Sequence, residues 1–276
     1  MLSPAETGVP SDILARRNRF RRCPNGKQLR LTERDLAILQ LLFRYRYLRT
    51  DQLVQLLQPQ SVKRLVERLG DLFHETGLIS RVNSTSDPFK AFCTPLIYEI
   101  SSKGITHLES LKALPNRAVT FSRRRRPAFN PQLHHTMAVI DALIRIECET
   151  RSELNQRFVP IDEILARAPD KVWQARNPLS IPITLLPSNN HPVVKRRTET
   201  HLIPDALYGI EYLIDGKKRY RFWALECERT TPTSRSSTSA SSRALKKATY
   251  DALLSTRAYR QHWGIPNLKL KMIEVR

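Results

Sequence analysis

The fold of this chain is decided by a stretch that begins as HLIPDALYGI at residues 201–210 and ends as YRFWALECER at residues 220–229. Between them, Asp215-Gly216-Lys217-Lys218 is a strong β-hairpin signal, so we expect two antiparallel strands. Residues two apart on a strand point to the same face of a sheet. One face of the second strand is therefore expected to carry Phe222, Ala224, Glu226 and Glu228, and the other Trp223, Leu225 and Cys227.

Three carboxylates are expected to meet at the ends of these strands. Asp205 lies early on the first strand, and Glu226 and Glu228 lie late on the second. Like charges at such positions repel each other unless a cation lies among them. The simpler interpretation is a half-exposed strand whose acidic side chains face water. The hairpin alone does not decide between the two.

The chain carries a large excess of positive charge. Its 276 residues include 46 Lys and Arg against 26 Asp and Glu, which gives a net charge of +20. Such an excess indicates a polyanionic partner, and nucleic acid fits better than a membrane surface. Because each neutralised phosphate releases counterions, we expect DNA affinity to fall steeply with salt. The length suits two domains of ordinary size.

No sequence pattern indicates membrane insertion or export. No apolar run approaches the roughly 20 residues that cross a bilayer, and the N-terminus lacks the apolar core of a signal peptide. The cysteines are too widely spaced for a zinc-ligand pattern. We therefore expect a cytoplasmic protein with reduced thiols at Cys23, Cys93, Cys148 and Cys227.

Residues 1–30 are rich in arginine and poor in apolar side chains, with seven basic and two acidic residues. This composition predicts a flexible basic arm that lies along DNA phosphates. A tail that only improves solubility would have the same composition, so both interpretations stay open.

Residues 31–114 have the pattern of three helices followed by two strands. Capping residues and apolar spacing predict helices from Thr32, from Thr50 and over 61–75, strands over 78–82 and 96–100, and a helix over 103–114. This order is that of a winged helix-turn-helix domain, whose third helix enters the major groove of DNA. The outward face of that helix presents Lys63, Arg64 and Arg68. Winged helices also serve as protein-interaction modules, although the charge favours DNA.

Residues 115–131 form the predicted linker. They contain four consecutive arginines, Arg123, Arg124, Arg125 and Arg126. Between two DNA-binding parts such a run is expected to follow a DNA strand, and a run that is merely solvated is the simpler alternative.

The second half begins with a predicted helix over 132–150. Glu147 falls on the apolar stripe of this helix, so its carboxylate needs either a cation or an arginine as partner. His134 and His135 open the helix, where capping or packing roles are expected.

Residues 151–200 are the least regular in pattern, and the end of the chain is clearer. Residues 229–242 are rich in Ser and Thr and indicate a loop. Besides the hairpin, the expected elements are a helix over 161–167, a strand over 179–186, a helix over 243–262 and a strand over 268–275.

The order of these elements resembles the PD-(D/E)XK nuclease-like fold. Joined to a winged helix, the chain is similar to the replication-relaxation family and the related MOBC class of mobilisation relaxases. The motifs that carry the resemblance are LTERDLAIL at 31–39, IPDA at 203–206 and LECERT at 225–230. It implies an α+β chain, with a winged helix-turn-helix domain at 31–114 and, at 132–276, a restriction-endonuclease-like α/β domain around a central mixed sheet.

The resemblance also implies a metal site. Asp205 and Glu226 would hold Mg²⁺ or Mn²⁺, because hard oxygen ligands prefer these ions. Glu228, and with it Glu147, would complete the first or second shell. The metal would polarise a DNA phosphate and activate a water molecule.

One position departs from the nuclease pattern. The pattern ends in lysine two residues after the acid, where this chain has Glu228. Lys246 and Lys247, on the following helix, are placed to supply the missing cation. The neighbouring tyrosines are expected to be packing residues: Tyr208, Tyr212, Tyr220 and Tyr250.

Three functions follow as alternatives. The first is a metal-dependent relaxase or endonuclease that nicks one DNA strand at the transfer origin of a plasmid or integrative element. The second is a non-catalytic, sequence-specific DNA-binding regulator of replication or transfer, in which the nuclease-like domain supports only homodimerisation or accessory contacts. The third is an adaptor that binds relaxosome or coupling proteins through its winged helix.

Overall fold

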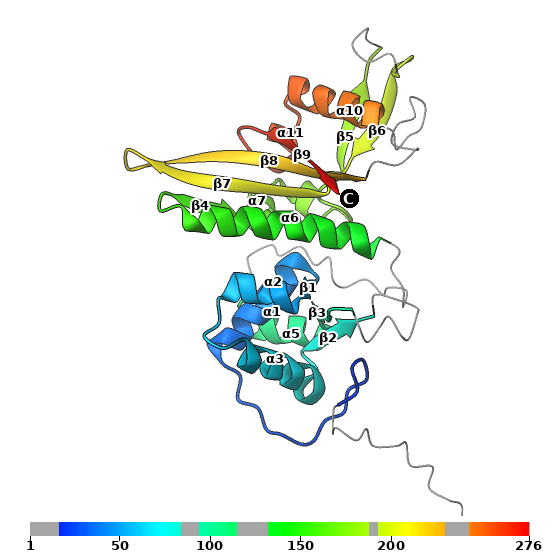
Figure 1. Cartoon of the computed structure of the whole chain (residues 1–276). Coiled ribbons are helices and arrows are strands. Elements are labelled where there is room, and N and C mark those ends of the chain that lie inside the picture. The colour runs from blue at the N-terminus through cyan, green and yellow to red at the C-terminus, as the bar shows by residue number, and fades with distance from the viewer. Residues whose placement is uncertain (1–16, 84–93, 115–131, 188–192, 230–242, 276) are drawn as a thin grey trace, which may run out of the picture.

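The computed structural model describes residues 17–83, 94–114, 132–187, 193–229 and 243–275 (Figure 1). Within these ranges the chain is mixed α+β, as predicted, and contains a three-stranded sheet, a four-stranded sheet and a pair of strands. None of the helices in these ranges has the length and apolar character needed to cross a membrane. Cys23, Cys148 and Cys227 are free thiols, and Cys93 lies outside the described ranges.

The N-terminal unit packs helices against a small antiparallel sheet (Figure 1). Its helices are α1 (Glu33–Tyr45), α2 (Thr50–Leu57), α3 (Val62–Asp71), the π-helical turn η1 (Leu72–Thr76) and α5 (Ser102–Ser110). Its strands, in sheet order, are β1 (Leu48–Arg49), β3 (Ile97–Ile100) and β2 (Ile79–Val82). The three helices and the two longer strands lie where the sequence predicts them, and β1 was not predicted.

Local sequence explains where α1 begins and where η1 ends. The backbone N–H and the hydroxyl of Thr32 donate to Asp35 Oδ2 at 2.7 and 2.8 Å, which closes the first turn of α1. Gly77 follows η1 with φ of 68°, a left-handed conformation that glycine adopts without a Cβ penalty.

Residues 17–30 do not form the free arm that their charge predicts. Arg17 pairs with Glu75 at 2.7 Å, and Lys27 pairs with Asp71 at 2.5 Å. The backbone N–H of Cys23 donates to His74 Nδ1 at 3.1 Å. These contacts fasten the segment to α3 and η1, because the carboxylates there neutralise part of its charge. Residues 1–16 lie outside the described ranges.

The C-terminal unit is built on a mixed four-stranded sheet (Figure 1). Its strands, in sheet order, are β4 (Gln156–Val159), β7 (Ala206–Ile214), β8 (Lys217–Arg229) and β9 (Lys269–Val275). Only the β8–β9 pair is parallel. The predicted alternation along β8 is confirmed, because Phe222 and Ala224 enter one hydrophobic cluster while Leu225 and Cys227 enter the other.

The two faces of this sheet are covered differently. α6 (Leu133–Ser152) packs on the face of Leu225 and Cys227. The opposite cluster draws on α7 (Ile161–Leu165), α8 (Asp170–Trp173), α10 (Arg243–Thr256), α11 (Tyr259–Trp263) and the antiparallel pair β5 (Ile181–Leu185) and β6 (Thr198–Leu202). The helix predicted over 243–262 is interrupted, because Arg257 adopts φ of 54° between α10 and α11. β4 and β6 were not predicted.

α6 is shared by the two units. Leu133, Met137, Ile140 and Ile144 pack into the N-terminal core, whereas Val139, Ala142 and Ile146 pack against the sheet. Polar contacts strengthen the first interface, since Asp141 Oδ1 accepts from Arg49 and Gln52, each at 2.7 Å. The two units are therefore joined through one helix that has a buried surface on both sides (Figure 1).

The hairpin prediction is confirmed in detail. Ile214 pairs with Lys217, so Asp215 and Gly216 alone form the turn. Both have positive φ, 51° and 71°, which is the conformation of a two-residue type I′ turn.

Candidate functional site

Asp205 lies in the bend between β6 and β7, directly before the strand on which it was expected. Its Oδ2 accepts a hydrogen bond from the backbone N–H of Cys227 at 2.9 Å, and its Oδ1 lies 3.0 Å from His135 Nε2 on α6. Burial by itself would raise the pKa of Asp205, but these two contacts outweigh it and hold the pKa below its usual value. Asp205 is therefore a fixed, ionised carboxylate.

Glu226 is completely buried in the middle of the sheet. Tyr250 donates its hydroxyl proton to Glu226 Oε1, and Lys246 Nζ forms an ion pair with Glu226 Oε2. Both partners come from α10, where residues four apart share one face of the helix. Lys247, one residue further on, is exposed. The structure thus brings Lys246, and not Lys247, to the buried acid.

The charges at this point of the fold are coupled. Burial and the negative charge of Asp205 raise the pKa of Glu226 to about 7, although Lys246 and Tyr250 act in the opposite direction. Burial would lower the pKa of Lys246, but Glu226 and Asp205 keep it above its usual value. We refer to Asp205, Glu226 and Lys246 as the acid–lysine cluster.

Glu228 lies at the edge of this cluster. Its Oε2 is 3.1 Å from Arg243 Nε, at the start of α10. Arg243 also pairs with Glu274 at 3.3 Å. Glu228 still contributes to the field that raises the pKa of Lys246. The acid that replaces the lysine of the nuclease pattern is thus held by an arginine near the surface.

The donor set of the cluster suits a Mg²⁺ or Mn²⁺ ion that keeps some of its water. Magnesium is commonly held by one or two carboxylates and completes its shell with water and phosphate oxygens. Burial raises the pKa of Glu226 and repulsion from Asp205 adds to it, and a cation between the two acids would relieve that repulsion. Three or more His, Cys, Asp or Glu side chains do not gather as metal ligands anywhere in the described ranges. The cluster therefore fits a two-carboxylate site and not an all-protein cage.

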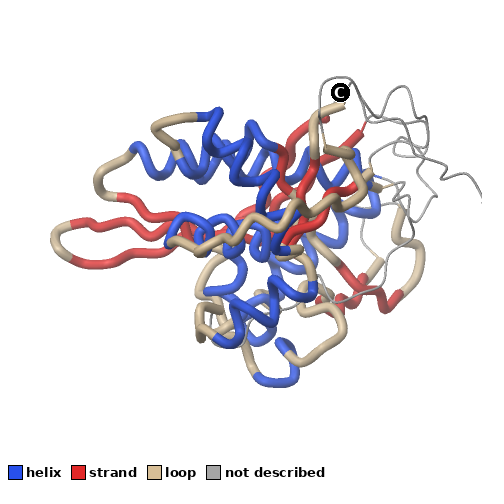
Figure 2. The backbone as a smooth tube through the Cα atoms, turned by 90° about the horizontal axis from the view of Figure 1, so that it is seen from below, coloured by secondary structure: helices blue, strands red, loops and turns tan. Residues whose placement is uncertain are grey.

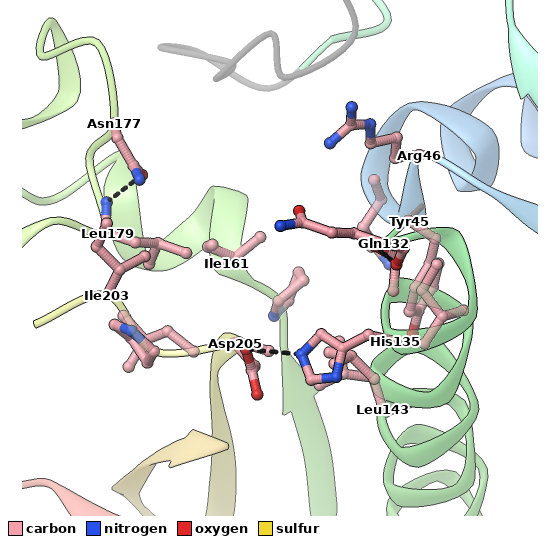
Figure 3. Close-up of a pocket in the computed structure, with 18 of the residues that line it drawn as sticks. Tyr45, Arg46, Gln132, His135, Leu143, Ile161, Asn177, Leu179, Ile203 and Asp205 are labelled. Carbon is pink, nitrogen blue, oxygen red and sulfur yellow. Dashed lines mark hydrogen bonds and ion pairs between the residues drawn. The ribbon is translucent and has the colours of Figure 1, made fainter. Parts of the chain in front are cut away.

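A cleft of about 890 Å³ opens beside Asp205 (Figure 3). It lies between the end of α1, the first half of α6 and the segments 173–179 and 203–207. Figure 3 places Asp205 and His135 together on one side, with Arg46 and Gln132 reaching in from α1 and α6 and Asn177 across from them. Arg44 and Arg176 add positive charge to the lining. The cleft is large enough for a nucleotide unit, and its lining carries three arginines against the single carboxylate of Asp205.

Glu147 does not belong to this site. Its carboxylate accepts from the Tyr45 hydroxyl and pairs with Arg151, and Arg44 lies 3.9 Å away. It follows His135 by twelve residues on α6, which places it about 18 Å further along the helix. The expectation that Glu147 is a metal ligand is wrong. Its buried carboxylate needed either a metal ion or an arginine as partner, and the fold supplies arginines.

The outward face of α3 is partly as predicted. Lys63 and Arg64 are exposed. Arg68 instead forms a 2.6 Å ion pair with the fully buried Asp35 and donates to the carbonyl of Arg30. It is therefore a structural residue, since a buried carboxylate requires a cation. Arg123, Arg124, Arg125 and Arg126 lie outside the described ranges.

Sequence reasoning missed the roles of His135, Tyr250 and Arg243. His135 and Tyr250 were assigned to packing or capping, yet each contacts an acid of the cluster. The only signal in the sequence was indirect, because a buried acid demands a donor. The donors lie 70 and 24 residues from their acids, so spacing could not identify them.

One comparison with known proteins finds a match. A family model described as replication-relaxation matches residues 39–268, which covers most of both units and the whole acid–lysine cluster. Neither the curated proteins nor the solved structures contain a match to the chain.

Proposed function

Because this chain belongs to the replication-relaxation family, we propose that it is a DNA-binding protein of replication or mobilisation that nicks one DNA strand at the acid–lysine cluster. The observation that carries this proposal is the meeting of Asp205, Glu226 and Lys246 from three separate parts of the fold. Two carboxylates lie around one lysine there, so the cluster has room for a further positive charge.

The arrangement of elements supports a nuclease of the PD-(D/E)XK type. One acid precedes a central strand of a mixed sheet, the second lies on the neighbouring strand, and the lysine comes from the next helix. The lysine in that fold usually follows the second acid by two residues. Here Lys246 places the same ammonium group against Glu226 from α10, which compensates for the acid at position 228.

Each group of the cluster has a separate task in the proposed reaction. Asp205, held by His135 and the N–H of Cys227, and Glu226, once it has lost its proton, would be the ligands of Mg²⁺ or Mn²⁺. Such an ion, when bound, polarises a phosphate and lowers the pKa of an attacking water. Lys246 would then turn toward the phosphate and stabilise the negative charge that develops there.

The N-terminal unit supports DNA binding at a distance from the cluster. Lys63 and Arg64 on α3 are exposed cations on the helix that a winged helix-turn-helix domain inserts into the major groove. α6 fixes this unit to the sheet, and the cationic cleft reaches from the end of α1 to Asp205. DNA located by α3 would therefore meet the cleft at a fixed position.

The test is nicking of a supercoiled plasmid that carries the candidate origin, with Mg²⁺ or Mn²⁺. We expect open circles with the wild type and a loss of about 100-fold or more in rate with Glu226→Gln or Lys246→Met. Lys247→Met is the matched control, because it removes the same charge from the neighbouring, exposed position of α10. Equal rates for the wild type, Glu226→Gln and Lys246→Met would refute catalysis at the cluster.

A second function is favoured by one observation. Both oxygens of Glu226 are taken by Tyr250 and Lys246, and Glu228 is taken by Arg243. A cluster satisfied by its own donors suits a regulator that binds DNA without cutting it. This alternative predicts salt-sensitive binding to a specific site and no strand breakage with any divalent ion.

A further inference from the structure

The β7–β8 hairpin extends well beyond the sheet that contains it (Figures 1 and 2). β9 first pairs with β8 at Trp223, and β4 last pairs with β7 at Tyr212. Six residues of β8 therefore precede its parallel neighbour, a length of about 20 Å, whereas Leu213 and Ile214 are the only residues of β7 beyond its pairing with β4. We call residues 210–221 the ribbon, and in both views its turn is the outermost point on its side of the molecule.

One face of the ribbon is electrically neutralised. Glu211 pairs with Lys218 across the two strands and with Arg157 of β4, each at 3.0 Å. The hydrogen bond from Arg157 is the main reason why the pKa of Glu211 falls to about 2. Arg157 also pairs with Glu163 at 2.8 Å. Cations and carboxylates on this closed face thus satisfy each other.

The opposite face is cationic and unpaired. Lys217, Arg219 and Arg221 alternate along β8, so they point to one side and lie about 6.7 Å apart. All three are exposed, and none of them forms an ion pair within the described part of the chain. Facing them across the ribbon are Ile214, Tyr212 and Ile210. We call this the open face.

We propose that the ribbon is a second DNA-binding element, which enters a groove of duplex DNA with its open face toward the backbone. The major groove, about 12 Å wide, admits a two-stranded β-ribbon, and the hairpin is two-stranded over residues 213–218. Arg219 and Arg221 lie where β4 adds a third strand, so they would meet phosphates at the rim of the groove. Three unpaired cations on one edge of such a ribbon can each neutralise a phosphate. The exposed Ile214, next to the turn, provides an apolar contact for the groove. The choice of DNA as partner rests on the proposed function.

Charge argues for DNA against a second copy of the chain. Two copies that paired through their ribbons would bring the open faces of a molecule with a net charge of +20 together. Cations along a free strand also oppose pairing between sheet edges. A polyanion is the partner for which both features are favourable.

The test compares two neighbouring residues that differ in the face they occupy. Arg219→Ala and Lys218→Ala remove one positive charge each, from adjacent positions of the same strand. Binding to a duplex oligonucleotide is measured against salt concentration with EDTA present, so that no cleavage occurs. We expect Arg219→Ala to weaken binding several-fold and to reduce the slope of log affinity against log salt by about 0.9, and Lys218→Ala to leave that slope unchanged.

The triple variant of Lys217, Arg219 and Arg221 to alanine extends the same measurement. Its slope should fall by about 2.7, the release expected for three phosphate contacts. Equal slopes for Arg219→Ala and Lys218→Ala would overturn the proposal, as would a triple variant that changes the oligomeric state without changing the slope. The nicking assay with Glu226→Gln is independent of the ribbon, so either conclusion can fail while the other stands.

Discussion

Two buried glutamates of this chain have nearly the same surroundings and, we infer, different tasks. Each accepts from a tyrosine hydroxyl and forms an ion pair with a basic side chain on a helix. Side-chain exposure is 2% for Glu147 and 0% for Glu226. The partners are Tyr45 and Arg151 for Glu147, and Tyr250 and Lys246 for Glu226.

The difference is the balance of charge around each acid. Burial raises the pKa of Glu226 and the negative charge of Asp205 adds to the effect, while Lys246 is the cation that pairs with Glu226. Glu147 also has a second acid nearby, because Arg44 lies 3.9 Å from Glu147 and 3.5 Å from Asp162, but two arginines, Arg44 and Arg151, neutralise this pair. Two acids with two arginines therefore indicate a structural network. Two acids that share one cation indicate a site where a charge is to be added or exchanged.

The largest expected effect separates the two glutamates by stability. Glu147→Gln removes the charge that Arg151 and Arg44 neutralise and should lower the free energy of unfolding by about 3 kcal/mol. This is the lower end of the range for breaking a buried ion pair, because Arg151 can turn toward water. Glu226→Gln removes repulsion from Asp205 and should cost nothing, or stabilise, near pH 8. Chemical denaturation of both variants at that pH measures the difference.

Equal losses in the two variants would break the comparison. In that case Glu226 would be as much part of a structural ion pair as Glu147, and the charge of Asp205 would carry no electrostatic cost. A loss confined to Glu226→Gln would reverse the assignment of the two sites.

Some parts of the fold could be predicted from the sequence and others could not. The hairpin, the alternation along β8 and the N-cap at Thr32 depend on neighbours within a few residues, and all three were predicted. β4 was missed because its sequence, QRFV, is only four residues long and does not alternate between apolar and polar side chains. Its partners on β7 lie 50 to 56 positions further along the chain.

Of the candidate site, the sequence predicted the acidic residues but not most of their partners. Asp205 and Glu226 stand in recognisable motifs, but Tyr45 contacts Glu147 over a separation of 102 residues. No spacing rule covers such a distance. The sequence therefore predicts that a buried acid needs a hydrogen-bond partner, but it does not identify the partner. Arg68 was misassigned for the same reason, because the buried Asp35 that holds it is 33 residues away.

The next prediction concerns the pH dependence of stability. Glu226 has a pKa of about 7 in the folded state against a usual value of 4.5, so the folded protein binds the proton more tightly than the unfolded chain. Its contribution to stability is complete below pH 4.5 and is lost as the pH rises through about 7. The expected loss is on the order of 3 kcal/mol.

The quantity to measure is the free energy of unfolding of the wild type minus that of Glu226→Gln, as a function of pH. His74 titrates in the folded state at about 4, and its contribution to stability rises with pH up to its usual value of 6.5. Subtracting the variant removes this opposing slope. The difference should fall between about pH 5 and pH 8. A difference that stays flat over this range would show that Glu226 ionises normally.

The smallest expected effect tests the metal by itself. A divalent ion that binds the folded cluster stabilises the protein by about 1.4 kcal/mol at ten times its dissociation constant. Mg²⁺ or Mn²⁺ should therefore raise the melting temperature of the wild type by a few degrees near pH 8, where Glu226 is ionised.

Asp205→Asn and Glu226→Gln should lose this response to the metal. Glu147→Gln should retain the response to the metal despite its lower starting stability, because position 147 lies about 18 Å along α6 from His135, which contacts the cluster. A response that survives Asp205→Asn would place the ion elsewhere, and burial together with Asp205 would then account for the raised pKa of Glu226 without a metal site.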